Sequence, residues 1–94
     1  MIGEKLNVNN NTAESRFEIL VGEDKAFLQY HQSSGKIDLL HTEVPDKLEG
    51  QGLGSKLARA AFEYTEKEHI KVIPSCPFIA GYLKKHSEYR HLMI

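Results

Sequence analysis

The sequence predicts a small α+β protein in which strands and helices form a mixed α/β layer. Three successive segments, at 16–21, 25–32 and 36–44, alternate apolar and polar residues and are separated by short turn signals. From residue 53 the apolar period lengthens to that of a helix, and a short apolar segment and a second helical pattern follow. The predicted order is therefore β-β-β-α-β-α, an antiparallel meander followed by a helix, a parallel strand and a short C-terminal helix.

The length and composition indicate one domain over residues 1–94. The 40% hydrophobic and 27% charged residues are typical of a soluble globular protein. A net charge of −1 argues against a nucleic-acid partner, and no apolar run is long enough to span a membrane. A single cysteine, Cys76, and a polar N-terminus without a secretory pattern predict a cytoplasmic protein without disulfides. The five scattered histidines show no metal-ligand spacing, so we expect no metal, and we expect a monomer.

The strands follow an Asn-rich start at residues 1–14, which we interpret as a loop or a frayed end. In "RFEILV" the apolar residues Phe17, Ile19 and Val21 alternate, as expected for a strand with one buried face. "GED" and "SSG" are turn signals that connect this strand to "KAFLQYHQ" and then to "KIDLLHTEV". Pro45 lacks an N–H and ends the third strand.

The helices occupy the second half of the chain. The predicted first helix runs from Leu53 to about Glu68, and its apolar stripe is Leu53, Leu57, Ala60, Ala61 and Tyr64. "IKVIP" then predicts a short buried strand. A second helix begins with Pro77 in its first turn, where proline is tolerated. The remaining tail either packs back on the domain or frays.

The segment "EGQGLG" at 49–54 places three glycines at the start of the first helix. Their spacing excludes the dinucleotide fingerprint, which needs glycines at relative positions 1, 3 and 6, and it also excludes the Walker loop. Glycines allow close backbone approach, and the first N–H groups of a helix have no internal partner. The pattern therefore favours a phosphate or pyrophosphate site. A tight turn that only requires positive φ is the alternative.

This loop, with "HTEVP" before it and "VIPSCPFIAGYLKKHSEY" after it, resembles the GCN5-related N-acetyltransferase (GNAT) superfamily, and more closely its small YjdJ-like group. The resemblance covers roughly residues 16–90. The pyrophosphate loop of the superfamily, Gln/Arg-x-x-Gly-x-Gly/Ala, maps onto Glu49, Gly52 and Gly54. Glu49 departs from the pattern, because a carboxylate facing a pyrophosphate would repel it.

The resemblance implies a minimal GNAT fold with a splayed V, between the strand before the loop and the strand after the first helix, that holds acetyl-CoA. The pantetheine arm would pair with the backbone of the upstream strand, and the diphosphate would rest on loop N–H groups. The implied acetyl-CoA-binding residues are Thr42, Glu43, Val44, Gly50, Gln51, Gly52, Leu53, Gly54, Ser55, Lys56 and Cys76. The acceptor site should be open and shallow, because a chain this small lacks the N-terminal elements of full-size relatives.

Four residues are candidates for catalysis in such a site. Cys76 precedes a helix, where a thiol pKa is lowered, so it is a nucleophile, a residue lining the thioester or a buried core residue. Tyr82 approximately matches the tyrosine acid of the family, and a core or rim aromatic is its alternative. His41 and Glu43 are candidate bases that an alternating strand directs to one face, although Glu43 is equally suited to a solvated strand end.

Three functions are compatible with this pattern. The first is an acetyl-CoA-dependent N-acetyltransferase that acts on an amine of unknown identity, by direct attack or through Cys76. The second is a CoA- or acyl-CoA-binding module with little or no transferase activity. The third is a small interaction domain in which the glycine loop only turns the chain.

Overall fold

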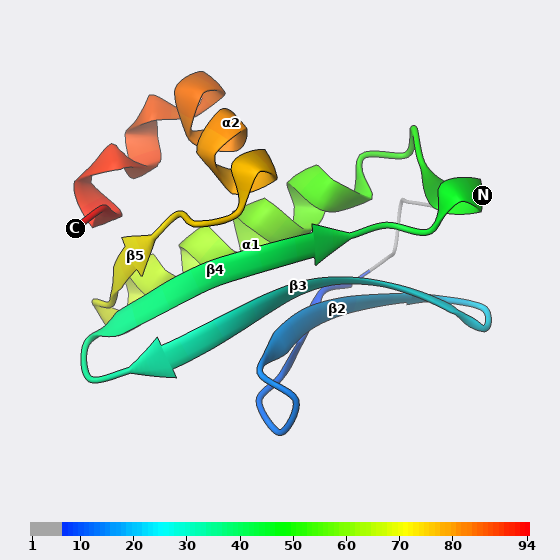
Figure 1. Cartoon of the computed structure of the whole chain (residues 1–94), viewed down its shortest axis with the longest axis horizontal. Coiled ribbons are helices and arrows are strands. Elements are labelled where there is room, and N and C mark those ends of the chain that lie inside the picture. The colour runs from blue at the N-terminus through cyan, green and yellow to red at the C-terminus, as the bar shows by residue number, and fades with distance from the viewer. Residues whose placement is uncertain (1–6) are drawn as a thin grey trace.

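The computed structural model describes residues 7–94, and its sheet confirms the predicted α+β fold (Figure 1). Five strands lie in the order β1-β2-β3-β4-β5, and every neighbouring pair is antiparallel except β4 and β5, which are parallel. The elements are β1 (Asn9–Asn11), β2 (Arg16–Val21), β3 (Asp24–Ser33), β4 (Lys36–Glu43), η1 (Asp46–Leu48), α1 (Leu53–Glu68), β5 (Lys71–Ile73), α2 (Pro77–Lys85) and η2 (Ser87–Leu92).

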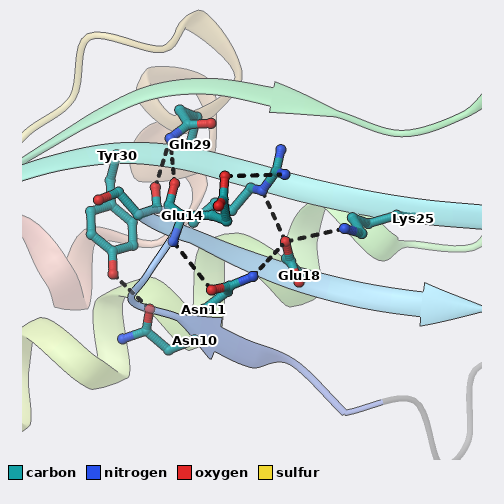
Figure 2. Close-up of polar contacts among 9 residues, drawn as sticks. Asn10, Asn11, Glu14, Glu18, Lys25, Gln29 and Tyr30 are labelled. Atoms are coloured by element: carbon teal, nitrogen blue, oxygen red, sulfur yellow. Dashed lines mark hydrogen bonds and ion pairs between the residues drawn. The ribbon is translucent and has the colours of Figure 1, made fainter.

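The loop predicted for residues 1–14 is wrong in one part, and its residues 1–6 lie outside the described residues. Asn9–Asn11 form β1, which pairs with β2. Figure 2 shows that polar side chains fix this strand: Asn11 donates to a Glu18 carboxylate oxygen at 3.2 Å, and the Tyr30 hydroxyl donates to Asn10 at 2.7 Å. Asparagine is depleted in strands, so these tertiary contacts override its propensity.

Glu18 is the charged centre of this polar cluster, and its side chain is only 6% exposed. Arg16 Nε lies 2.9 Å and Lys25 Nζ lies 3.4 Å from the same carboxylate oxygen of Glu18 (Figure 2). The carboxylate is thus paired with cations, as a buried charge requires. The contacts of Glu18 with Asn11, Arg16 and Lys25 tie β1, β2 and β3 together on the sheet face that lies away from the helices.

Helix α1 packs against β2, β3 and β4 and supplies much of the core. Leu53, Leu57 and Ala61 are buried as expected, whereas Ala60 and Tyr64 are only half-buried. The buried stripe also includes Ala58, Phe62 and Thr65. It is wider than the sequence pattern indicated because α2 and η2 cover a second side of α1, where the Phe62 ring stacks on Tyr82 and Tyr89.

The C-terminal tail packs back on the domain. It forms η2, in which Leu92 is buried, and Met93 bridges to Val72 beside β5. Within residues 7–94, no helix is long and apolar enough to cross a membrane. The same residues include no group of three His, Cys, Asp or Glu side chains placed to hold a metal ion.

A β-bulge in β4 changes which residues face the helices. Gln29 pairs with His41 and Tyr30 pairs with Leu39, so Leu40 has no partner and is 42% exposed. Before the bulge Leu39 faces the core, and after it Thr42, opposite the buried Leu28, takes that direction. His41 therefore faces away from the helices, as bulges can re-aim side chains near functional sites.

Candidate functional site

A cleft opens where β4 and β5 separate. Their pairing ends at Asp38 and Ile73, and the Cys76 N–H then donates to the Leu39 carbonyl at 2.8 Å. Beyond this bond β5 no longer pairs with the edge of β4, and the segment that follows β5 diverges from β4 (Figure 1). The cleft between this free edge and the glycine loop has a volume of about 570 Å³. It is lined by His41, Thr42, Glu43, Val44, Leu48, Glu49, Gly50, Gly52, Leu53, Gly54, Ser55 and Phe78.

The glycine loop needs its glycines for two different reasons. Gly50 and Gly52 have φ angles of +83° and +74°, which L side chains rarely adopt. Gly54 lies inside α1 with ordinary φ, but a Cβ there would stand 2.9 Å from Cζ of Phe78. Gly54 therefore allows the Phe78 ring to pack closely against the first turn of the helix.

The start of α1 offers unpaired donors to the cleft. Gly52 is the N-cap residue, no side chain caps the helix and no acidic residue lies in its first turn. The first intrahelical bond runs from the Lys56 N–H to the Gly52 carbonyl at 3.1 Å. The N–H groups of Leu53, Gly54 and Ser55 precede it and have no intrahelical acceptor, so an anion can bind there with the favourable end of the helix dipole.

The cleft brings together most of the residues that the sequence indicated for acetyl-CoA. Three of the indicated residues lie elsewhere: Gln51 and Lys56 do not line the cleft, and Cys76 lies behind Thr42. Lys56 borders a separate hollow beside Arg59 and Glu63. Sequence reasoning missed Leu48 and Phe78, whose only signal was their position next to the glycine loop and to Cys76.

Cys76 is buried at 3% exposure and is the N-cap residue of α2. Its Sγ lies 3.3 Å from the Thr42 hydroxyl oxygen, in hydrogen-bond contact. Burial raises the pKa of this thiol, but the Thr42 hydroxyl and the N–H groups of Ile79 and Phe78 outweigh burial, so the net pKa is lowered. No side-chain hydrogen bond caps α2, so its first N–H groups stay available to a thiolate.

His41 and Glu43 lie on one face of β4, as the sequence predicts for alternate strand positions. His41 Nε2 and a Glu43 carboxylate oxygen are 3.2 Å apart, and both side chains are about 60% exposed, at 62% and 61%. Because of the bulge at Leu40, they face away from Cys76, which contacts the neighbouring Thr42. β4 thus carries an imidazole–carboxylate pair on one side, and on its other side Thr42 contacts the buried thiol of Cys76, which does not line the cleft.

Tyr82 does not line the cleft. Its ring stacks on His86, with centroids 4.0 Å apart, and on Phe62 at 5.9 Å, and it borders a second hollow beyond Phe78. Burial, followed by the neighbouring Tyr89, raises the pKa of its phenol. The side chain belongs to the packing between α1 and α2.

Comparisons with known proteins agree with this geometry. The family model described as GCN5-related N-acetyltransferase matches residues 16–92. Protein NATD1 of Mus musculus is 32% identical over 87 residues, which cover 89% of this chain and 79% of that protein. Protein NATD1 of Xenopus tropicalis is 39% identical over 64 residues, and the match spans 67% of this chain but only 59% of the frog protein. The solution NMR structure of a GCN5-like candidate N-acetyltransferase from Staphylococcus aureus superimposes with a TM-score of 0.74 at 30% identity, covering 98% of this chain and 91% of that one.

Proposed function

The chain belongs to the GCN5-related N-acetyltransferase family, and we propose that it transfers an acetyl group from acetyl-CoA to an amine. One observation carries the proposal: the uncapped N-terminus of α1, with its glycine loop, faces the free edge of β4 across one cleft. A thioester attached to a long polar arm and a diphosphate needs both features. The arm requires an extended backbone to pair with, and the diphosphate requires clustered N–H donors.

In this proposal the N–H groups of residues 50–55 hold the diphosphate, and the backbone of residues 42–44 pairs with the pantetheine arm. Positive φ at Gly50 and Gly52 supports this role, because it allows the loop to approach a ligand without side chains intervening. Glu49 also lines the cleft and is exposed. Its carboxylate therefore repels the bound diphosphate, and the surrounding water weakens that repulsion. Backbone donors therefore supply the attraction, and Glu49 weakens it.

Direct transfer uses the imidazole–carboxylate pair. The neutral amine nitrogen attacks the thioester carbonyl carbon, the C–S bond breaks, and its electron pair leaves on the CoA sulfur. His41, oriented by Glu43 at 3.2 Å, accepts the proton that the amine loses. The leaving thiolate takes a proton from water, because the cleft is open and Tyr82 does not line it.

A covalent route is the second form of the same reaction. The Cys76 thiolate attacks the thioester carbonyl, an S-acetyl bond forms on Cys76, and the CoA thiolate leaves with the electron pair of the broken C–S bond. The amine then attacks the acetyl-Cys76 carbonyl and loses its proton to water, the C–S bond breaks, and Cys76 leaves with the electron pair as a thiolate that Thr42 stabilises. The lowered pKa of Cys76 and its contact with Thr42 support this route, whereas its 3% exposure requires the cleft wall to move.

A CoA-binding module is the alternative function, and one observation favours it. Among residues 7–94, α1 packs against β2, β3 and β4 on one sheet face, and no helix covers the opposite face, where His41 and Glu43 lie (Figure 1). An acceptor would therefore find little enclosure. An open face of this kind suits a large acceptor that brings its own surface, or no acceptor at all.

Two measurements on the full chain separate these possibilities. Amide chemical shifts of residues 50–55 and 42–44 with and without acetyl-CoA report binding, and no movement of the glycine loop would contradict both functions. Thiol release from acetyl-CoA, with a lysine peptide, spermidine or an arylamine present, reports transfer. Release above the rate without amine supports the transferase, whereas shifts without release for any amine favour the binding module.

The chemical route is tested by mass. Incubation with acetyl-CoA alone should leave an acetyl adduct on wild type and none on Cys76→Ser if the covalent route operates. Amine-dependent turnover that survives in Cys76→Ser but falls in His41→Ala supports direct transfer. His31→Ala is a matched control, since His31 is also exposed on the sheet but does not line the cleft.

A further inference from the structure

A buried charge lies on the face of the sheet that no helix of residues 7–94 covers (Figure 1). The Glu18 side chain is 6% exposed there, and Arg16, Lys25 and the Asn11 amide lie within 3.4 Å of one of its oxygens (Figure 2). Taking such charges out of water is costly, and apolar residues of similar volume are often as stabilising as a buried ion pair. Stability alone therefore does not explain why this position carries a paired carboxylate.

Strand pairing connects Glu18 to His41 through Phe27. Two adjacent rows of side chains cross β2, β3 and β4 on this face: Glu18–Phe27–Glu43 and Arg16–Gln29–His41. Two members of the second row contact Phe27 diagonally. The guanidinium carbon of Arg16 lies 4.8 Å from the centre of the Phe27 ring, and the His41 ring lies 6.2 Å from it at an interplanar angle of 64°. The half-buried Phe27 ring thus lies between the buried charges and the imidazole.

His41 has few other contacts that could fix its ring. Its side chain is 62% exposed, and so is that of its polar partner Glu43, at 61%. Exposed ion pairs of this kind contribute little. The amide nitrogen of Gln29, which pairs with His41 across the strands, is already bonded to the carbonyls of Glu14 and Ser15. A ring packed nearly edge to face provides a second contact, with a preferred orientation.

We propose that Phe27 is a positioning residue for His41, and that Arg16, anchored on Glu18, holds the Phe27 ring for this role. Phe27 and Glu43 together restrict the imidazole to one orientation. His41 Nε2 faces a Glu43 carboxylate oxygen at 3.2 Å, so Nε2 carries the proton and Nδ1 is left to accept a proton from the amine. The inference rests on the proposed use of His41 as the base and assigns to this face of the sheet the residues that orient it.

The first pair of variants removes and restores the ring. In Phe27→Leu, kcat for amine-dependent thiol release should fall about fivefold, the size of effect that one aromatic pair supplies. KM for acetyl-CoA should not change, because Phe27 does not line the cleft. Phe27→Tyr keeps the ring and should keep a kcat within about twofold of wild type. A kcat of Phe27→Leu equal to that of wild type would overturn the inference.

A second pair separates positioning from stability. Arg16→Gln and Lys25→Gln each remove a cation that pairs with Glu18, but of the two only Arg16 lies over the Phe27 ring. Both variants should lower the melting temperature, and only Arg16→Gln should lower kcat. Equal losses of kcat would mean that activity follows the stability of the sheet, and the positioning role would fall. This pair decides the question if Phe27→Leu does not fold.

The decisive readout does not depend on turnover. Carbon-13 relaxation of the His41 Cε1–H bond in the full chain reports the order of the imidazole, which should fall in Phe27→Leu and Arg16→Gln and persist in Phe27→Tyr and Lys25→Gln. His31, exposed on the same face of β3, is the internal reference and should not change. Unchanged order of His41 in Phe27→Leu overturns this inference, while the transferase proposal stands on the turnover of wild type. If wild type releases no thiol with any amine, His41 has no reaction to serve, and both proposals fall together.

Discussion

Replacing Gly52 with aspartate is the most direct test of the diphosphate position. Gly52 is the N-cap residue of α1, lines the cleft and has nothing within 4 Å of its potential Cβ, so the new side chain extends into open space. A carboxylate about 4 Å from a phosphate charge is repelled by about 1 kcal/mol in water and about 4 kcal/mol near a protein surface. Since about 1.4 kcal/mol is a factor of ten, CoA should bind at least about fivefold more weakly.

Gly35→Asp is the matched control for this substitution. Gly35 lies in the turn between β3 and β4 with φ of +68°, close to the +74° of Gly52, and it too has nothing within 4 Å. Both variants add one negative charge and the same left-handed backbone strain of about 1–2 kcal/mol. Calorimetric titration of CoA should show weak binding only for Gly52→Asp, and added salt should reduce the difference. A dissociation constant of Gly52→Asp within twofold of that of Gly35→Asp would refute the diphosphate position.

Three further substitutions probe the walls of the cleft. Glu49→Gln removes an exposed carboxylate that lines it and should tighten CoA about two- to fivefold at low salt, and unchanged affinity would mean that the carboxylate points away. Thr42→Val removes the hydroxyl that lowers the Cys76 pKa, so alkylation of Cys76 by iodoacetamide should require higher pH, and an unshifted profile would contradict the contact. Gly54→Ala places a Cβ 2.9 Å from Phe78 Cζ, so in thermal unfolding it should be less favourable by about 1 kcal/mol in the wild-type background than in a Phe78→Leu background, where the preference of the helix for alanine is no longer offset. Equal losses with and without Phe78→Leu would contradict that close approach.

The order of the elements could be predicted from local patterns because those patterns report burial of one face. Alternation in "RFEILV" and the helical period from Leu53 each reflect packing against one continuous core, and the structure confirms β2 and α1. β1 could not be predicted in this way, because its three asparagines bury no apolar face. Contacts of Asn10 with Tyr30 and of Asn11 with Glu18, distant in the sequence, hold it in the sheet.

The site could be predicted only in part, for a different physical reason. Glycine chemistry and helix-terminus donors are local, so the glycine loop at 50–55 could be recognised in the sequence as a candidate phosphate site. The bulge at Leu40 was not, because the Leu39–Leu40 pair in "DLLHTE" is equally compatible with a regular strand that exposes one leucine, and the register shift arises only on pairing with β3. That shift directs Thr42 toward Cys76 and His41 away from it, so no count along the strand could assign the two sides of the cleft.

The departures from local rules differ in what they imply about function. β1 departs from strand propensity, yet its compensating contacts explain it fully, so it carries no functional meaning. Gly50 and Gly52 are explained by backbone conformation and Gly54 by the Phe78 ring, but all three also line the cleft. Gly81 has neither compensation and borders a hollow that meets the cleft. A local rule broken without a structural compensation is the stronger pointer to a functional constraint, so Gly81 is a position to test beside the glycine loop.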